Sequence, residues 1–248
     1  MTLRGNTALV TGASSGLGQH FARLLAAQGA EVILAARRRE ALDRLCADIA
    51  ETAGAVVGLP LDVTDADAVK AAIAGLPRPP DILINAAGIS AAKPALELSC
   101  AEWDCTHDTN LRGAFLVARA VAERLVADGR GGTIVNVASI LGHRVAGNLA
   151  AYAASKAGLV RLTEVLAVEW ARHGIRVNTL CPGYIETDLN REFFQSQAGQ
   201  ALIKRIPQRR LGRPEDLDGA LLLLVSAAGS FMTGTSLVVD GGHLVSPL

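Results

Sequence analysis

Residues 6–29 read NTALVTGASSGLGQHFARLLAAQG, and this stretch decides which fold the rest of the chain must follow. The apolar run Thr7-Ala8-Leu9-Val10 has the length and composition of a short buried strand. A glycine-rich turn from Gly12 to Gly18 comes directly after it, and an amphipathic helical pattern then runs to Gly29. Strand, glycine-rich turn and helix in this order predict half of a βαβ unit that binds a nucleotide.

The glycine-rich turn has the chemistry that a pyrophosphate needs. Glycine lets the backbone approach a phosphate closely, and the N-terminus of the following helix offers free N–H groups and a partial positive charge. The spacing is GxxxGxG, and Gln19 stands where a P-loop needs lysine, which excludes a P-loop. We expect cofactor contacts from Gly12, Ser14, Ser15, Gly16, Leu17 and Gly18.

Strands and helices alternate along the rest of the chain, without a linker, a repeat or a low-complexity tract. Further strands are expected at 31–36, 55–61, 81–85, 133–138, 175–180 and 236–239, and helices at 38–53, 65–74, 101–128, from before Tyr152 to Trp170, and at 214–228. This alternation predicts the α/β class, with one doubly wound domain over residues 1–248, about seven parallel strands and helices on both faces of the sheet. The connection 184–213 is long enough to be a lid, with an apolar inner face from Phe193 and Phe194.

The end of the second strand bears on the choice between NAD(H) and NADP(H). In βαβ dinucleotide sites an acidic residue near this point binds the ribose 2′-hydroxyl, whereas an arginine accommodates a 2′-phosphate. Here the strand leads into Arg37-Arg38-Arg39, and no acid is present. We therefore favour NADP(H), with Arg37 on the phosphate and Ser14 or Ser15 assisting. NAD(H) stays open, because the three arginines could simply form the solvated start of the next helix.

Two further strand ends are expected to complete the cofactor site. Asp62 and Val63 follow the third strand, where an aspartate can reach the edge of an adenine. Small residues follow the fourth strand and would let a flat ring or a ribose lie against the backbone; this segment is Asn85, Ala86, Ala87 and Gly88. Asn110 lies inside the long helical stretch 101–128, where asparagine is costly, so we expect a kink or a functional contact there.

The candidate catalytic residues lie in the stretch from Ser139 to Lys156, SILGHRVAGNLAAYAASK. Tyr152 and Lys156 are four residues apart on one helix face, so the ammonium can lie beneath the phenol. At an effective dielectric of about 20, a charge roughly 4 Å away is worth about 4 kcal/mol, which lowers a pKa by about three units. The pKa of Tyr152 would then lie near ~7, where a general acid/base works best. Ser139, at the carboxyl end of the fifth strand, would hold the substrate oxygen by hydrogen bonding.

Composition restricts the partners that the chain can have. Its 248 residues include 24 basic and 24 acidic side chains, so no excess of positive charge argues for nucleic acid. The four cysteines form no CxxC pair and are expected to be reduced packing residues, with no metal site. The first residues lack the apolar core of a signal peptide, and no apolar run reaches membrane-spanning length. We expect a cytoplasmic globule with a small-molecule substrate and with neither a nucleic-acid nor a membrane partner.

The assembled motifs resemble the short-chain dehydrogenase/reductase family over essentially the whole chain. The resemblance rests on Thr11–Gly18, Asn85–Gly88, Asn110, Ser139, Tyr152-Ala153-Ala154-Ser155-Lys156 and Pro182-Gly183. Within the family, the chain is similar to the 3-oxoacyl-carrier-protein reductase branch and to related bacterial alcohol dehydrogenases. Ala86 departs from the commoner NNAG motif, which removes one side-chain hydrogen bond.

That resemblance implies a Rossmann-like fold and an NAD(P)(H)-dependent oxidoreductase that interconverts a secondary alcohol and a ketone. It implies a catalytic tetrad of Asn110, Ser139, Tyr152 and Lys156, in which Tyr152 exchanges the proton, Lys156 also binds the nicotinamide ribose and Asn110 holds a water. It places Pro182, Gly183, Ile185 and Thr187 at the nicotinamide. It also implies a homotetramer or a homodimer, in which the small residues Ala151, Ala153, Ala154, Ala157 and Gly158 could pack against a partner.

Several alternatives stay open at this point. The substrate could be a 3-oxoacyl thioester, although Arg112, Arg119, Arg124 and Arg130 do not clearly mark a surface for an acyl carrier protein. Specificity is expected from the loop 140–149 and the lid, where Tyr184, Leu189, Phe193 and Phe194 suggest an apolar wall. A catalytically silent sensor or scaffold is disfavoured because the tetrad is complete. A serine hydrolase built on Ser139 and His143 is disfavoured because no glycine precedes the serine.

Overall fold

The computed structural model describes residues 2–51, 55–187 and 191–246. Within these residues, seven parallel strands form one sheet in the order β3-β2-β1-β4-β5-β6-β7. The strands are β1 (Thr7–Thr11), β2 (Glu31–Ala36), β3 (Val56–Pro60), β4 (Ile82–Asn85), β5 (Gly132–Val137), β6 (Ile175–Pro182) and β7 (Ser236–Val239). Every strand expected from the sequence is confirmed, with its ends close to the predicted ones.

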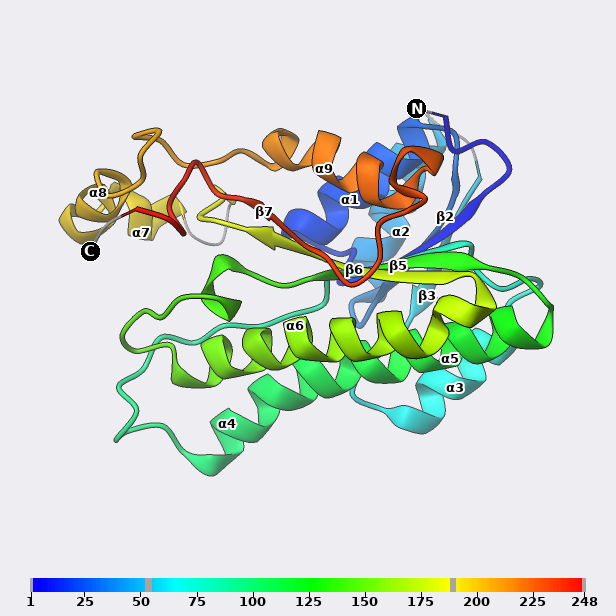
Figure 1. The fold of residues 1–248 in the computed structure, drawn as a ribbon, viewed down its shortest axis with the longest axis horizontal. Helices are drawn as coiled ribbons and strands as arrows, with labels where there is room; N and C mark the ends of the chain where they lie inside the picture. Colours follow the sequence, from blue (N-terminus) through cyan, green and yellow to red (C-terminus); the bar gives the residue numbers. More distant parts are fainter. Residues whose placement is uncertain (1, 52–54, 188–190, 247–248) are drawn as a thin grey trace.

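Helices cover both faces of this sheet (Figure 1). Their bounds are α1 (Gly16–Ala27), α2 (Arg39–Ala50), α3 (Ala66–Ala74), α4 (Cys100–His107), α5 (Ala114–Ala127), α6 (Ala150–Trp170), α7 (Arg191–Gln195), α8 (Gln197–Ile203) and α9 (Asp218–Val225). In Figure 1, α1, α2 and α9 lie on one face of the sheet, and α3, α5 and α6 lie on the other. The doubly wound α/β arrangement predicted from the alternating pattern is therefore confirmed.

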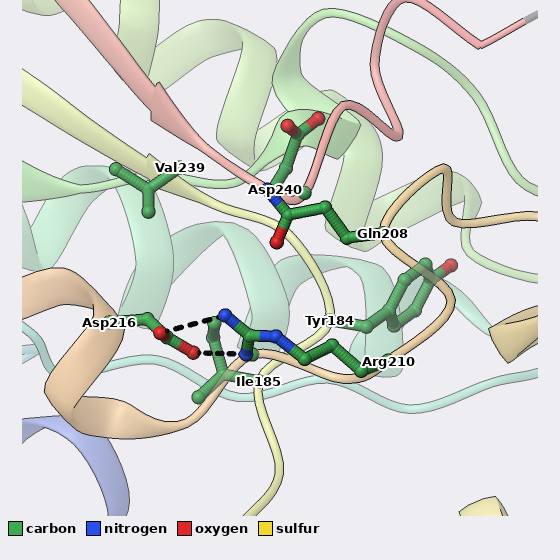
Figure 2. Close-up of a pocket in the computed structure, with 9 residues that line it drawn as sticks. Tyr184, Ile185, Gln208, Arg210, Asp216, Val239 and Asp240 are labelled. Atoms are coloured by element: carbon green, nitrogen blue, oxygen red, sulfur yellow. Dashed lines mark hydrogen bonds and ion pairs between the residues drawn. The ribbon is translucent and has the colours of Figure 1, made fainter.

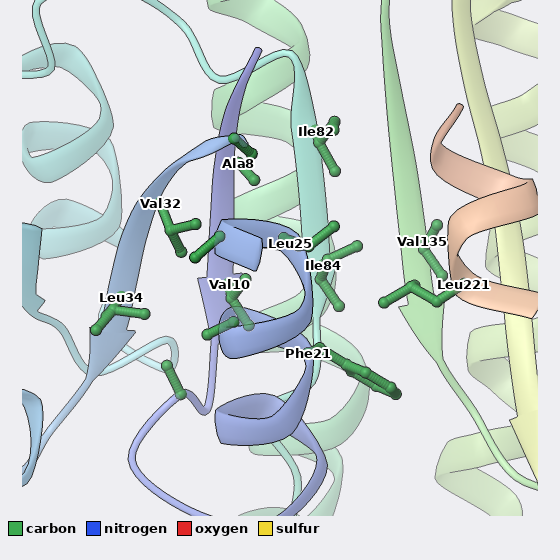
Figure 3. Packing of buried hydrophobic residues seen from close by; sticks show 14 of the residues in the cluster. Ala8, Val10, Phe21, Leu25, Val32, Leu34, Ile82, Ile84, Val135 and Leu221 are labelled. Carbon is green, nitrogen blue, oxygen red and sulfur yellow. The ribbon is translucent and has the colours of Figure 1, made fainter. Parts of the chain in front are cut away.

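The strand β1 shows how the two faces are packed. Ala8 and Val10 point to one face and join a cluster with Phe21 and Leu25 of α1 (Figure 3). Leu9 points to the other face and joins the cluster beneath α3, α5 and α6. A fully buried Leu or Phe side chain contributes about 1.5–3 kcal/mol. Because both faces are apolar and buried, a slip of one residue would exchange the two sets, and the register is strongly specified.

The centre of the sheet forms the crevice in which ligands of such folds bind. β1 pairs with β2 on one side and with β4 on the other, so the strand order reverses between β1 and β4. Thr11, at the carboxyl end of β1, accepts hydrogen bonds from the N–H groups of Ala86 at 3.1 Å and of Ala87 at 3.2 Å. This hydroxyl fixes the segment after β4 against the glycine-rich turn after β1.

The long helix expected at 101–128 is interrupted at Asn110. The structure has α4, a π-helical turn over Asp108–Gly113 and then α5. A Cβ at Gly113 would lie 2.8 Å from Cγ2 of Val63, so only glycine lets this turn pack against the end of β3. Asn110 itself is fully buried. The predicted distortion is confirmed, and it takes the form of a π-turn, a feature frequently found at functional sites.

The connection 184–213 contains α7, α8 and a bridge that pairs Ile185 with Gly212. Phe194 is buried and its ring lies 5.9 Å from that of Tyr184, as expected for an inner face. Phe193 is half-exposed, so the prediction that both phenylalanines line the inside is wrong for Phe193, which contacts the ring of Phe194 from outside. Leu189 lies outside the described residues. No helix in the described ranges is long and apolar enough to span a membrane.

Candidate active site

Ser139, Tyr152 and Lys156 meet at the carboxyl end of β5. Ser139 follows that strand and caps the 3₁₀ turn Ile140–Gly142, where its hydroxyl accepts a hydrogen bond from the N–H of Leu141 at 3.1 Å. The hydroxyl of Ser139 lies close enough to that of Tyr152 to lower the pKa of the tyrosine. Tyr152 lies in the first turn of α6, and Lys156 lies one turn further on with its Nζ 5.7 Å from the centre of the Tyr152 ring. The i,i+4 geometry predicted from the sequence is therefore present.

The pKa values of this pair differ from the sequence expectation. Burial raises the pKa of Tyr152 above its ordinary value, and the hydrogen bond from Ser139 opposes this only in part. Burial also lowers the pKa of Lys156 to about 8, and its ammonium donates a hydrogen bond to the carbonyl of Val137 at 2.8 Å. The prediction that Lys156 lowers the pKa of Tyr152 toward 7 is wrong for this structure. The physical reason is that desolvation by burial is the largest influence on both groups and disfavours the charged form of each.

Asn110 holds the backbone near Lys156. Its Oδ1 accepts a hydrogen bond from the N–H of Ile89 at 2.8 Å, and its Nδ2 donates to the carbonyl of Ile89 at 2.9 Å and to Oγ of Ser155 at 3.1 Å. A Cβ at Gly88 would lie 3.3 Å from Oδ1 of Asn110 and 3.5 Å from Nζ of Lys156. The side chain of Asn110 is thus used to position its neighbours, and Gly88 leaves the space between it and the lysine.

Ser155 is a buried residue that the sequence reasoning did not assign. Its hydroxyl donates to the carbonyl of Tyr152 at 2.8 Å and accepts from Asn110. It therefore connects the π-turn to the first turn of α6, on which the tyrosine sits. The signal was present, because Ser155 lies inside the Tyr-Ala-Ala-Ser-Lys motif, but a serine in a helix is compatible with many roles.

The glycine-rich turn is tightly packed against the protein at Gly12 and Gly18, and it has free space at Gly16. A Cβ at Gly12 would lie 2.8 Å from the backbone of Ala87, and one at Gly18 would lie 2.3 Å from the carbonyl oxygen of Gly12. A Cβ at Gly16 would meet nothing within 4 Å. Ser15, the N-cap of α1, makes no side-chain capping bond, so it leaves the first N–H groups of the helix uncapped. This cradle fits a phosphate group bound at a helix N-terminus.

The segment after β4 supplies a second polar feature of the crevice. Nδ2 of Asn85 donates to Oδ1 of Asn136 at 2.9 Å and to the carbonyl of Ala114 at 3.0 Å. Its own Oδ1 is buried and has no hydrogen-bond partner in the part of the chain that the structure describes. Ala86 and Ala87 lie next to it, against the glycine-rich turn. These residues leave a surface that suits a ligand which is flat and partly polar.

The arginines after β2 differ from one another in their contacts. Nη2 of Arg38 donates to Oγ of Ser14 at 3.1 Å and to its carbonyl at 3.3 Å. Arg37 is highly exposed and its Nη1 lies 4.0 Å from Oδ2 of Asp62. The carboxylate of Asp62 accepts bonds from Thr64, which together with Arg37 hold its pKa below the ordinary value. The sequence favours Arg37 at this position, whereas the arginine attached to the glycine-rich turn is Arg38.

The segment after β6 runs beside the catalytic residues. Gly183 is required there, because a Cβ would lie 2.7 Å from Cα of Asp240. Ile185 is buried, and Thr187 is half-buried. A cavity of about 230 Å³ lies between this segment, the lid and β7 (Figure 2). It is lined by Tyr184, Ile185, Gln208, Arg210, Gly212, Asp216, Val239, Asp240 and Gly241, and Figure 2 shows the paired hydrogen bonds between Arg210 and Asp216 at its edge.

A family model described as enoyl-(acyl carrier protein) reductase matches residues 12–243. The chain is 39% identical over 246 residues to D-threitol dehydrogenase of Mycolicibacterium smegmatis, covering 98% of this chain and 94% of that protein. It is 40% identical over 249 residues to gluconate 5-dehydrogenase of Gluconobacter oxydans, covering 99% and 97%. It is also 36% identical over 248 residues to a 3-oxoacyl-[acyl-carrier-protein] reductase of Thermotoga maritima, covering 99% and 100%.

Solved structures resemble this chain equally closely. A gluconate 5-dehydrogenase from Burkholderia cenocepacia, in complex with NADP and tartrate, superposes with a TM-score of 0.94 and 37% identity, covering 99% of this chain and 98% of that one. These likenesses extend over essentially the whole chain. The protein is an NAD(P)-dependent oxidoreductase that interconverts a secondary alcohol and a ketone. It belongs to the short-chain dehydrogenase/reductase family.

Proposed function

We propose that Tyr152 is the general acid/base of this reaction and that Ser139 positions the reacting oxygen. The observation that carries the proposal is the grouping of three side chains at the end of β5: Ser139 acts on the hydroxyl of Tyr152, and the buried ammonium of Lys156 lies 5.7 Å from the centre of the tyrosine ring. A substrate oxygen between these hydroxyls receives a hydrogen bond from Ser139 and exchanges its proton with Tyr152. A bound nicotinamide, held at its ribose by Lys156, would supply the hydride donor or acceptor for the ketone or carbinol carbon.

Lys156 and Asn110 support this proton transfer. Lys156 has a pKa of about 8, so its charge responds to small changes around it. An ammonium at this position stabilises a phenolate by Coulomb attraction, and its remaining N–H groups are suited to the hydroxyls of a ribose. Asn110 acts as a positioning residue, because its amide holds Ile89 and Ser155 on either side of the lysine.

The arginines after β2 support NADP(H) as the preferred cofactor. Arg38 is attached to Ser14 of the phosphate turn, and Arg37 lies near Asp62 at the neighbouring strand end. Two cations at the place where a dinucleotide presents its adenosine ribose favour a 2′-phosphate over a free hydroxyl. Asp62 and Val63 are then expected beside the adenine. Ile185 and Thr187 are expected beside the nicotinamide carboxamide, since both follow Pro182-Gly183 at the end of β6.

A 3-oxoacyl thioester is the second candidate substrate, because the relative from Thermotoga maritima carries that name. An acyl carrier protein is acidic and would need accessible arginines near the site. Arg124 instead binds the carbonyls of Ile73, Ala74 and Leu76, and Arg119 pairs with Glu123. The contacts of these arginines therefore favour a small free substrate over a carrier-bound one.

The assembly and the location of the enzyme are further parts of the proposal. Val165 and Val168 of α6 are exposed apolar side chains, which supports the packing of this helix against a second copy in a homotetramer or homodimer. Two of the small residues named for that contact face inward instead, since Ala151 is buried and Gly158 approaches Leu111. Light scattering tests the assembly. The four cysteines are free thiols, which suits a reducing cytoplasm.

The experiment that tests the function measures ketone-dependent oxidation of NADPH and of NADH by their absorbance. Cofactor binding is measured separately by nicotinamide fluorescence. We expect tight NADPH binding, weaker NADH binding, and turnover with small hydroxylated ketones. Binding of either cofactor without turnover of any alcohol or ketone would favour a silent sensor, and no binding at all would contradict the proposal.

A further inference from the structure

The C-terminal segment after β7 fixes His243 at the same edge of the molecule as the catalytic residues. Asp240 holds a tight turn there, because its carboxylate accepts hydrogen bonds from the N–H of Gly242 at 2.8 Å and from the N–H of Leu244. Gly241 and Gly242 have φ angles of +65° and +86°, which only glycine adopts without strain. In Figure 1 this segment lies beside α7 and α8, on the side where α6 begins. The position of His243 is therefore defined by the turn and does not depend on its own side chain.

The side chain of His243 is buried, yet one of its polar atoms is unused. It is 7% exposed, and its ring lies 5.4 Å from that of Tyr184. Nδ1 has no hydrogen-bond partner in the described part of the chain. Buried polar atoms without partners are rare in native proteins, and each one calls for an explanation such as a functional role or a bound water or ion. Burial lowers the pKa of His243, and so does the nearby charge of Arg144, so the ring is neutral at pH 7 and can donate or accept at Nδ1.

Arg144 brings an unneutralised positive charge to the same place. Its Nη1 donates to the main-chain carbonyl of His243. Within the described ranges, no carboxylate lies within ion-pair distance of it. A half-buried guanidinium without an acidic partner is a binding element for an anion, because charge-assisted hydrogen bonds are about twice as strong as neutral ones.

Both residues are coupled to the catalytic hydroxyls through short connections. Arg144 follows Ser139 by five residues, across the 3₁₀ turn Ile140–Gly142. Tyr184, which contacts the ring of His243, lies close enough to Tyr152 to raise its pKa. Arg144 in turn acts on the pKa of Tyr184. Arg144 and Tyr184 each contact or approach His243, and Tyr184 connects this group to Tyr152. We call the three side chains the Arg144–Tyr184–His243 wall.

We propose that Arg144 and His243 bind the carboxylate of a polyhydroxylated acid, whose alcohol or keto carbon lies at Tyr152. The inference rests on the proposed function and specifies its substrate class. Two donors, one cationic and one neutral, match the two oxygens of a carboxylate, and Tyr184 offers a hydroxyl for a neighbouring alcohol group. A neutral polyol would leave the charge of Arg144 without a counterion. The wall is predicted to determine specificity, and the hydride and proton transfers stay as described above.

The test uses two matched pairs of probes that differ only in their terminal groups. Tartrate and threitol have the same two central hydroxyls, with carboxylates in the first and primary alcohols in the second; D-gluconate and D-glucitol differ in the same way at one end. Each is titrated by calorimetry into the wild-type enzyme with bound NADP(H). We expect each acid to bind at least ten times more tightly than its neutral counterpart.

Three variants locate the preference. Arg144→Gln is expected to weaken binding of gluconate about tenfold or more, with glucitol and NADPH unchanged. His243→Asn keeps a polar atom near the position of Nδ1 and should retain most of the acid preference, whereas His243→Leu should lose it. Arg172→Gln, on an exposed turn at the far end of α6, is the matched control and should change nothing.

The inference would be overturned if the wild type bound acids and neutral polyols equally, or if Arg144→Gln weakened both members of a pair to the same extent. Equal weakening would mean that Arg144 only supports the fold. Failure of the proposed function looks different, because the enzyme would then bind the acids without oxidising or reducing any alcohol or ketone. An enzyme that turns over neutral substrates without any acid preference would keep the function and lose the inference.

Discussion

The crevice proposed for the cofactor has a catalytic end at Ser139 and Lys156 and an adenosine end at Arg37 and Arg38. These two ends differ in how firmly their side chains are held. At the catalytic end, Ser139, Lys156 and Asn110 are all buried, and each is held by at least one hydrogen bond to a defined partner. At the adenosine end, the side chain of Arg37 is 72% exposed and reaches its acidic neighbour only at 4.0 Å. Burial leaves a side chain one low-energy arrangement, while exposure leaves it many. Changes at the first end should therefore have large effects, and changes at the second should have small ones.

The largest effect is expected for Tyr152→Phe. General acid/base catalysis contributes about 10²–10⁴-fold to a rate, so kcat should fall about 10³-fold or more. Because phenylalanine fills the same space, the free energy of unfolding and the Kd for NADPH should change little. Steady-state kinetics and a fluorescence titration measure the two quantities. Turnover within tenfold of the wild type would remove Tyr152 from the role of acid/base.

The next test addresses the charge buried beneath the tyrosine. A lysine whose pKa is lower in the folded state than in the unfolded state binds its proton more weakly when the protein is folded. At pH values where the lysine is protonated in the unfolded chain, this difference lowers the free energy of unfolding. For Lys156, the fall from 10.5 to about 8 corresponds to about 3 kcal/mol. This penalty applies fully below pH 8 and disappears as the pH rises toward 10.5. We therefore compare the free energy of unfolding of Lys156→Met with that of the wild type at two pH values. The difference in favour of the variant should be about 3 kcal/mol larger at pH 7 than at pH 10.5.

Urea denaturation of both proteins at several pH values measures this difference. The comparison between pH values removes any constant cost of leaving the carbonyl of Val137 without its donor. Parallel stability curves for wild type and Lys156→Met would show that Lys156 is not destabilised by burial. Burial at the catalytic end would then carry no cost in the free energy of unfolding, and the two ends would not differ in this respect.

The glycine-rich turn lies between the two ends of the crevice. We expect substitutions in it to have large effects, as at the buried catalytic end. In Gly12→Ala the added methyl would meet the backbone of Ala87 at 2.8 Å, at a φ of +67° that L-residues rarely adopt. Strain of this kind costs about 1–3 kcal/mol, and the turn must shift to relieve it. We expect a loss of about 2 kcal/mol in the free energy of unfolding and a Kd for NADPH at least tenfold higher. Gly219→Ala is the control, since a methyl there meets nothing within 4 Å.

How much could be predicted from the sequence follows the same division. The strands, the switch point and the places of Ser139, Tyr152 and Lys156 were readable, because apolar runs specify buried strands and the catalytic side chains sit at strand ends or at helical spacing. The pKa of Tyr152 was not readable, since it depends on the balance of desolvation against charge, and that balance requires the packed structure. His243 was not readable either, because the last turn places it near Arg144 across 99 residues of sequence.

The choice between Arg37 and Arg38 shows most clearly what the sequence alone could not predict. Consecutive residues at the end of a strand point to opposite sides. The sequence alone did not show which of the two arginines faces the glycine-rich turn. The structure attaches Arg38 to Ser14, through a hydrogen bond at an exposed position. Because the contact is exposed, its contribution to stability is small.

The smallest effect is therefore expected at this end, where three adjacent arginines give an internal comparison. Arg38→Ala should raise the Kd for NADPH about tenfold, because it removes the cation attached to the phosphate turn, and Arg37→Ala should raise it about threefold. Arg39→Ala should have no effect, since Arg39 lies in α2 at 3.9 Å from Asp43. The Kd for NADH should stay constant in all three, and the differences should shrink at high salt because exposed charges are screened. If Arg37→Ala had the larger effect, the arginine predicted from the sequence would be the correct one, and the contact between Arg38 and Ser14 would only hold the turn in place.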